Sequence, residues 1–237
     1  MRTSSAVWMA WMMVGCGEDD PESPVDGDPP GMELDDEFDG DLSAWEVLHP
    51  DQAAIRVEGG QLHVEPAAGS LWFNARAGVL VHQPIEGDFV ATTFASARRL
   101  SDPSLPPEPQ YRLGGLMTRA PGSAENYVFI VVGADGDDVS VETKTTVDGA
   151  SMFMGPAFPT GAGQLRVCRV GATFRMLARE TESAAWVERA SFDRPDLPEV
   201  LQVGPMGYAN NPDPDLRVSF DYVRFASPDG PDACMAP

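Results

Sequence analysis

The sequence predicts an all-β protein: a two-sheet antiparallel jelly-roll β-sandwich that follows a disordered acidic linker. Three observations support this prediction. Many short segments alternate between apolar and polar residues, which is the period of a half-buried strand. Gly, Pro, Asn and Asp interrupt these segments at short intervals. No long segment has the periodicity of an amphipathic helix, so two packed sheets, or a closed barrel, are the architectures that fit.

The expected strands follow one another along residues 33–237, which we expect to form a single domain. Residues 54–58 and 61–65 flank Gly59-Gly60, a two-residue turn typical of a β-hairpin. Residues 98–110 contain four prolines and are expected to form a long loop. The remaining predicted strands are 88–97, 111–119, 126–132, 139–146, 164–170, 173–180, 186–190, 202–209 and 216–225.

Several short motifs occur in a characteristic order along this domain. They are DEFDG at 36–40, GQLHV at 60–64, GDFV at 87–90, GLMTR at 115–119 and FDYVRF at 220–225. In this order they resemble the concanavalin A-like lectin and glucanase superfamily, and most of all its DUF1349-type branch. The resemblance implies a concanavalin A-like sandwich. It does not imply one activity, because the superfamily contains lectins, glycoside hydrolases and adhesion modules.

The first residues have the features of an export signal. Arg2 precedes an apolar run over residues 6–14, and the small residue Gly15 stands before Cys16. This resembles the lipobox of bacterial lipoproteins, so residues 1–15 are expected to be a signal peptide and Cys16 to carry the lipid. The resemblance implies an exported protein anchored to the bacterial outer membrane, on its periplasmic or outer face. An ordinary signal peptide with an incidental Cys16 is the alternative.

The segment that follows Cys16 is strongly acidic. Between residues 17 and 41 there are 12 acidic side chains and no Lys or Arg, so residues 16–32 are expected to be a disordered spacer. The whole chain has a formal net charge of −21. That charge argues against nucleic acid and anionic lipid as partners. Contact with the membrane is therefore expected only through the lipid on Cys16.

The expected function is carbohydrate binding without catalysis, with a carbohydrate or envelope glycan as partner. Such sites combine apolar walls with a few placed polar groups. Trp72 and Asn74 would share one face if their segment is a strand, although core packing is the alternative for the buried aromatic residues. The candidate ligand-binding residues are Trp72, Asn74, Arg119, Tyr127, Trp186, Tyr208 and Asn210.

A glycoside hydrolase is an alternative that needs two carboxyl groups, about 5–5.5 Å apart in the retaining mechanism. The pattern Glu-x-Asp-x-Glu occurs once, at residues 33–37, next to the linker rather than across a central strand. Glu142 has no carboxylate two residues away. No catalytic residue is therefore assigned, and a structural or adhesion module that binds protein is a further alternative.

No cofactor is expected, with a structural calcium ion left open. Asn211, Asp213 and Asp215 alternate in one turn, and Asp39 and Asp221 offer a second set of oxygen ligands; turn formation is the favoured role of such residues.

If Cys16 is acylated, two cysteines remain, Cys168 and Cys234. We expect them to form a disulfide in an exported protein. A buried free thiol at Cys168 is the alternative.

Overall fold

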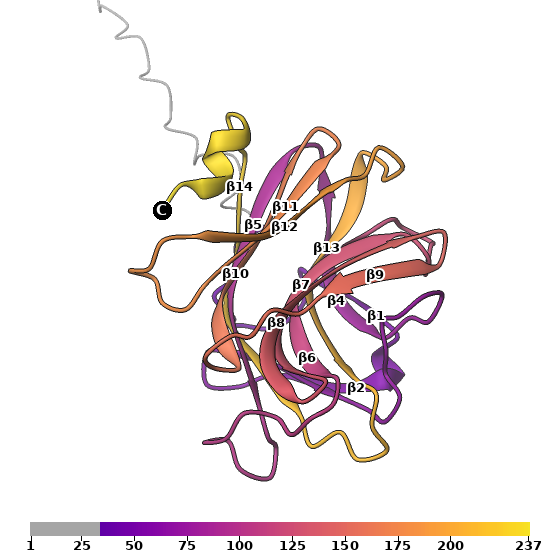
Figure 1. Ribbon diagram of the computed structural model, residues 1–237, viewed down its shortest axis with the longest axis vertical. Helices are drawn as coiled ribbons and strands as arrows, with labels where there is room; N and C mark the ends of the chain where they lie inside the picture. Colours follow the sequence, from indigo (N-terminus) through magenta and orange to yellow (C-terminus); the bar gives the residue numbers. More distant parts are fainter. Residues whose placement is uncertain (1–33) are drawn as a thin grey trace, which may run out of the picture.

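The computed structural model describes residues 34–237 and confirms the predicted architecture of two packed antiparallel sheets (Figure 1). The predicted signal peptide (1–15), the proposed lipid attachment at Cys16 and the linker (16–32) lie outside the described residues. No helix within residues 34–237 is long and apolar enough to cross a membrane.

Each sheet contains seven strands. The first sheet has the spatial order β1 (Glu46–Leu48), β4 (Val79–Glu86), β13 (Val200–Ala209), β6 (Arg112–Arg119), β7 (Tyr127–Asp135), β8 (Asp138–Val147) and β9 (Ala150–Met154). The second has the order β12 (Val187–Asp193), β11 (Thr173–Arg179), β10 (Ala162–Val170), β5 (Phe89–Arg98), β14 (Arg217–Ala226), β3 (Leu62–Pro66) and β2 (Ala53–Val57).

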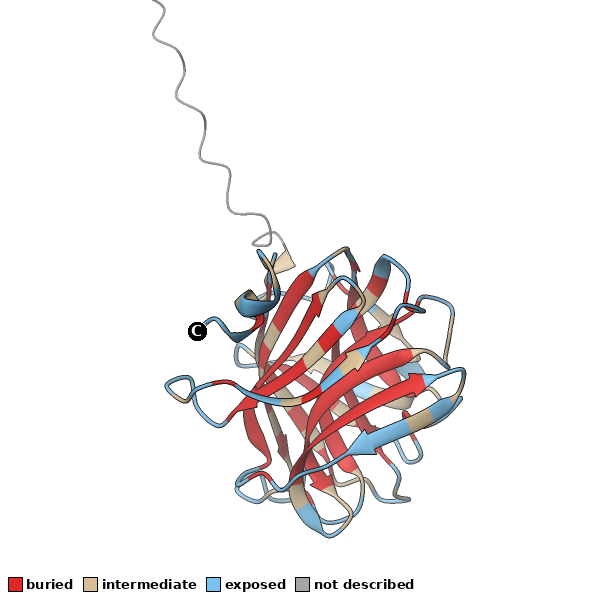
Figure 2. Cartoon of the chain, turned by 45° about the horizontal axis from the view of Figure 1, so that its top comes forward, coloured by how far each residue is buried: buried red, intermediate tan, exposed pale blue. Residues whose placement is uncertain are grey.

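The main core lies between the two sheets and is formed by alternate residues of their strands (Figure 2). In β5, Ala91, Ala95 and Ala97 are fully buried, whereas the intervening side chains of Thr92 and Phe94 are only partly buried. Small residues at these positions let the facing sheet approach closely, and its inward side chains fill the space.

The outer face of the first sheet carries a second apolar layer. Residues 67–78, between β3 and β4, place Leu71 and Trp72 over this face, where they pack with Tyr127 and Phe129 of β7. Strand β7 is therefore buried on both faces, which explains its nearly continuous apolar sequence.

The outer face of the second sheet is covered partly by the end of the described chain. A short 3₁₀ turn, Pro231–Met235, packs there, and Cys234 forms a disulfide with Cys168 of β10, with their Cα atoms 5.6 Å apart. The bond spans 66 residues. In the chain-entropy model a loop of that length contributes about 4 kcal/mol to stability.

Candidate functional site

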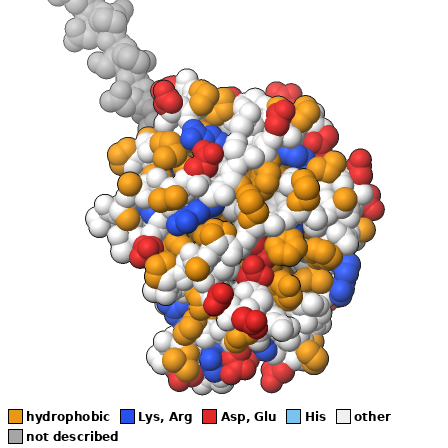
Figure 3. Space-filling view, viewed as in Figure 1, with side chains coloured by type: hydrophobic (Ala, Val, Ile, Leu, Met, Phe, Trp, Pro, Cys, Tyr) orange, Lys and Arg blue, Asp and Glu red, His pale blue; other side chains and the backbone are white. Residues whose placement is uncertain are grey.

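The outer face of the first sheet contains a cavity of about 180 Å³, which we call the aromatic cavity. Its walls come from β8, β9 and β13, from the segment before β4, and from the residues that flank β6 and β13. The lining residues are Leu71, Phe73, Tyr111, Glu142, Lys144, Phe153, Tyr208 and Asn210. Hydrophobic side chains gather on the surface beside β9, where Met152, Phe153 and Met154 are exposed (Figure 3).

Strand register places the two charged residues of this cavity on one face. In β8, Glu142 is paired with Val131 and Lys144 with Phe129, so both side chains share the outer face with the aromatic residues of β7. Glu142 is fully buried and Lys144 is only 3% exposed. Residues of segment 67–78, together with Phe153 of β9 and Tyr208 of β13, lie against these side chains.

Lys144 is surrounded by aromatic rings. Its Nζ atom lies 4.7 Å from the ring centre of Phe129, 5.2 Å from that of Tyr208 and 5.3 Å from those of Phe73 and Phe153. It donates to the carbonyl oxygen of Trp72 at 3.0 Å and contacts Oε1 of Glu142 at 3.1 Å. An ammonium group has three donors, so one remains for another acceptor.

Glu142 is half satisfied. Its Oε1 atom accepts hydrogen bonds from Tyr208 and Lys144, whereas its buried Oε2 atom has no partner among the described residues. Burial raises the pKa of Glu142, and the Lys144 ammonium opposes this shift. Burial also lowers the pKa of Lys144, and Glu142 opposes that shift. A buried polar atom without a partner destabilises the fold. The Oε2 atom of Glu142 is therefore an acceptor that a ligand in the cavity could satisfy.

Two of the seven predicted ligand-binding residues, Tyr208 and Asn210, line this cavity. Trp72 and Tyr127 lie next to it, but their rings are fully buried and pack edge to face, with centroids 5.4 Å apart. The indole nitrogen of Trp72 donates to the carbonyl oxygen of Val79. Trp72 thus supports the cavity and offers Lys144 its carbonyl oxygen, so its expected role as an open sugar platform is wrong.

The condition under which Trp72 and Asn74 would share one face is not met, because residues 67–78 do not form a strand. Asn74 occupies an exposed turn and has a positive φ of 54°. Its backbone nitrogen donates to Oγ of Ser151 at 2.8 Å, and its side-chain oxygen accepts from the Ser151 backbone at 3.2 Å. These bonds attach the covering segment to β9.

Arg119 and Trp186 do not join the aromatic cavity either. Arg119 is buried at the far end of β6, where it donates to Gln202 and to the carbonyl oxygen of Ser123. Trp186 is buried on the outer face of the second sheet, where it packs with Cys168 and Cys234. The predicted set is therefore divided between the two outer faces.

Sequence reasoning did not place the two charged residues in a binding site, although it weighed Glu142 as a catalytic carboxylate. Lys144 is the only lysine in the chain, and Glu142 precedes it by two positions. This spacing within a strand was the available signal that both side chains share one face.

Three of the five residues with a possible calcium role use their side chains in protein contacts. The carboxylate of Asp215 accepts from Ser101, and that of Asp221 accepts from Gln61. The side chain of Asn211 donates to the carbonyl oxygen of Gln110. Within residues 34–237, no group of three or more His, Cys, Asp or Glu side chains is arranged to hold a metal ion.

Comparison with known proteins identifies relatives only at the level of structure. No family model matches the sequence, and no curated protein matches it. A functionally unknown protein from Saccharomyces cerevisiae has a similar structure, with a TM-score of 0.66 and 17% identity over 81% of this chain and 100% of its own.

A glycoside hydrolase and a lectin are among the other similar structures. A xylan β-1,4-xylosidase from Bacillus halodurans C-125 has a TM-score of 0.63 and 16% identity over 89% of this chain. The match covers 41% of that enzyme, so this chain spans about two fifths of its length. A lectin from Bauhinia forficata in complex with GalNAc has a TM-score of 0.56 and 11% identity over 81% of this chain and 95% of its own. The chain therefore has the concanavalin A-like jelly-roll sandwich fold.

Proposed function

We propose that this chain is a non-catalytic carbohydrate-binding protein whose aromatic cavity accepts one sugar ring. The observation that carries the proposal is the unpartnered Oε2 atom of Glu142 beside the Lys144 ammonium, within a wall of aromatic rings. Aromatic rings pack against the apolar face of a sugar, while a carboxylate accepts and an ammonium donates hydrogen bonds to its hydroxyls.

The dimensions of the cavity favour a small ligand. Drug-sized ligands occupy pockets of about 300–1,000 Å³, whereas this cavity holds about 180 Å³. A single ring, or the terminal ring of a longer glycan, is the size that fits. Phe153 is 44% exposed, so its ring is available to pack against a further sugar ring of a longer glycan.

The carboxylate arrangement favours binding over hydrolysis. Glycoside hydrolases commonly use two carboxyl groups that flank the scissile bond. Glu142 is the only carboxylate among the residues that line the aromatic cavity, and its Oε1 atom is held by Tyr208 and Lys144. The fold supports either activity, since it occurs in the xylosidase and in the lectin described above.

A glycan array followed by calorimetry tests this proposal. Phe153→Ala and Glu142→Gln should each weaken binding to the selected glycan at least tenfold, which corresponds to about 1.4 kcal/mol. Met152→Ala is the matched control, because Met152 lies next to Phe153 on β9 but outside the cavity lining. Binding to no glycan, or undiminished binding by Phe153→Ala, would overturn the proposal. Release of reducing sugar would favour the hydrolase alternative.

We further propose that Cys16 carries a lipid and anchors the protein to the bacterial outer membrane. The residues before Cys16 support this, and so does the use of the other two cysteines of the chain in the Cys168–Cys234 disulfide. Mass spectrometry of the N-terminal peptide from a detergent-extracted membrane fraction should show acyl chains on Cys16. The Cys16→Ala variant should be absent from that fraction, and recovery of unmodified Cys16 from it would contradict the anchor.

A further inference from the structure

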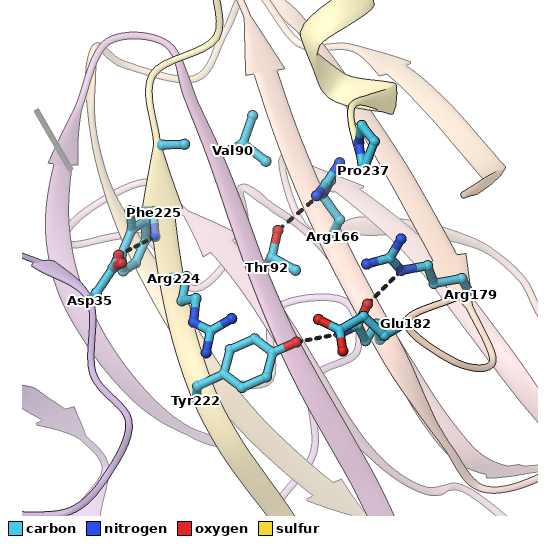
Figure 4. A pocket seen from close by; sticks show the side chains of 12 residues that line it. Asp35, Val90, Thr92, Arg166, Arg179, Glu182, Tyr222, Arg224, Phe225 and Pro237 are labelled. Atoms are coloured by element: carbon cyan, nitrogen blue, oxygen red, sulfur yellow. Dashed lines mark hydrogen bonds between the residues drawn. The ribbon is translucent and has the colours of Figure 1, made fainter. Parts of the chain in front are cut away.

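A second, larger cavity lies on the outer face of the second sheet (Figure 4). It has a volume of about 450 Å³, and we call it the arginine cavity. Arg166 of β10 and Arg179 of β11 line it together with Thr92, Gln164 and Tyr222. It is separate from the aromatic cavity, because the two lie on opposite outer faces of the sandwich.

Arg166 and Arg179 are buried against the same aromatic ring. Their exposed fractions are 7% and 9%. Their guanidinium carbons lie 4.1 Å and 4.3 Å from the ring centre of Trp186. This packing holds both planar groups in fixed positions beside the cavity.

All hydrogen-bond partners of these two arginines are neutral. Arg166 donates to Oγ1 of Thr92 at 3.0 Å and to the carbonyl oxygens of Cys234 at 2.9 Å and Ala236 at 2.6 Å. Arg179 donates to the side-chain oxygen of Gln164 and to the carbonyl oxygen of Ala184. Within residues 34–237, neither guanidinium forms an ion pair with a carboxylate, unlike Arg56, Arg99, Arg175, Arg194, Arg217 and Arg224. In the same range the buried Arg112, Arg119 and Arg169 also lack such a pair, but they do not line this cavity.

Neither guanidinium therefore has a carboxylate of the described chain within ion-pair distance, although Asp35 and Glu182 line the same cavity. Buried charges in proteins are normally paired, because an unpaired one carries a large desolvation cost. Burial, together with the neighbouring Arg179 charge, lowers the pKa of Arg166 to about 10, so the group still carries its charge at neutral pH. Two like charges therefore line one cavity in a protein whose net charge is −21.

We propose that the arginine cavity binds a carboxylate-bearing sugar, such as a uronic acid, with the carboxylate between Arg166 and Arg179. Planar guanidinium groups match the geometry of a carboxylate. Gln164 and the Tyr222 hydroxyl line the same cavity and provide partners for sugar hydroxyls. Asp35 and Glu182 also line it. Their negative charges repel a dianion such as phosphate more strongly than a single carboxylate.

Calorimetric titration of the purified protein with D-glucuronate and with D-glucose tests the charge requirement. The two sugars differ only in the carboxylate, so glucuronate should bind at least tenfold more tightly. Arg179→Gln should lower the affinity for glucuronate at least tenfold. The matched control is Arg175→Gln, which removes the same charge from the same strand at a residue that pairs with Glu188 and does not line the cavity.

Stability measurements separate a ligand site from a structural role. Because Arg179 lacks an anionic partner, Arg179→Gln should leave the melting temperature of the ligand-free protein unchanged or raised, while the affinity falls. Arg166→Lys supplies a second test, since a charge without the planar fork should also bind glucuronate less tightly. Equal binding of the two sugars, no binding of either, or full affinity in Arg179→Gln would overturn the proposal.

A further variant distinguishes a sugar ligand from a segment of the chain itself. Replacing Glu18, Asp19, Asp20 and Glu22 by their amides removes acidic side chains near the start of the chain. If only that variant binds glucuronate, the chain's own acidic segment is the occupant, which would overturn the assignment of a sugar. Phe153→Ala should leave glucuronate binding intact, which keeps this result independent of the aromatic cavity.

Discussion

The hydroxyl group of Tyr208 donates a hydrogen bond of 2.9 Å to Oε1 of Glu142, and both side chains are almost completely buried. Tyr208→Phe keeps the ring but removes this donor from a carboxylate that already has an unpartnered oxygen. We expect the free energy of unfolding to fall by about 1–3 kcal/mol, measured by urea denaturation.

A double-mutant cycle checks the origin of this loss. In the Glu142→Gln background the partner of Tyr208 is neutral, so Tyr208→Phe should cost less than it does in the wild type. An equal cost in both backgrounds would show that the loss does not come from the hydrogen bond to the Glu142 carboxylate.

The second prediction concerns the buried cation. Lys144→Met removes the only lysine of the chain and leaves Glu142 buried without an ion-pair partner. The expected destabilisation is about 3–5 kcal/mol. The combined variant Glu142→Gln/Lys144→Met carries no buried charge here and should recover most of that loss.

The pH dependence of Lys144→Met has a defined sign. In the wild type the Lys144 ammonium opposes the effect of burial on the pKa of Glu142. Lys144→Met removes this opposition, so the pKa of Glu142 in the folded protein rises further above its ordinary value of 4.5. The folded protein then holds a proton that the unfolded chain has released. The stability deficit relative to wild type should therefore narrow as the pH falls from about 7 towards 5. A deficit that widens over this range would contradict the assignment.

The third prediction concerns His82 on β4. Burial lowers its pKa below the ordinary value of 6.5; Glu46 opposes this shift and Arg119 adds to it. Below pH 6.5 the unfolded chain binds a proton that the folded protein does not, so the wild type should lose stability as the pH falls towards the folded pKa. The limiting slope is about 1.4 kcal/mol per pH unit for one group.

The variant His82→Gln isolates this contribution, because glutamine retains a polar contact to Gln202, which His82 meets at 3.1 Å. Unfolding free energies measured between about pH 7.5 and 5.5 should fall less steeply in the variant. Identical slopes would show that His82 binds its proton equally in the folded and unfolded states, which would contradict the lowered pKa.

The fourth prediction joins the disulfide to the arginine cavity. Cys168→Ala/Cys234→Ala opens a 66-residue loop and should lower the free energy of unfolding by about 4 kcal/mol. It also frees the segment whose carbonyl oxygens at Cys234 and Ala236 hold Arg166. Glucuronate affinity should fall in this variant, whereas glycan binding at the aromatic cavity should persist. Loss of both would indicate general unfolding.

Local alternation predicted much of the sheet structure. The hairpin around Gly59-Gly60 appears as β2 and β3, within one or two residues of the expected bounds. Strand β4 was missed because its first five residues are all buried, which removes the alternation. Strand β9 was missed because it is short and exposes Met152, Phe153 and Met154 where polar residues are expected.

The candidate site was less accessible to sequence reasoning, because long-range packing forms it. Aromatic side chains such as Trp72 and Tyr208 are visible as candidates, but their burial depends on how residues 67–78 cross the first sheet. The role of Glu142 can be recognised only from the strand register, which pairs it with Val131, and from its burial on the outer face of the first sheet. Trp186 was a candidate for the same site, but it lies on the outer face of the second sheet.

The pairing of Asp36 with Val223 has a mechanical consequence. Two backbone hydrogen bonds of 2.9 Å and 2.8 Å join them, and Val223 lies in β14, which is flanked by β5 and β3. A pulling force applied to the residues before Asp36 is therefore transmitted to β14, an interior strand of the second sheet, and not to an edge strand. Because the sheets of a sandwich are stacked about 10 Å apart, the aromatic cavity lies across the full thickness of the domain from that point of load. A protein tethered in this way would hold its sugar-sized cavity on the side turned away from the tether.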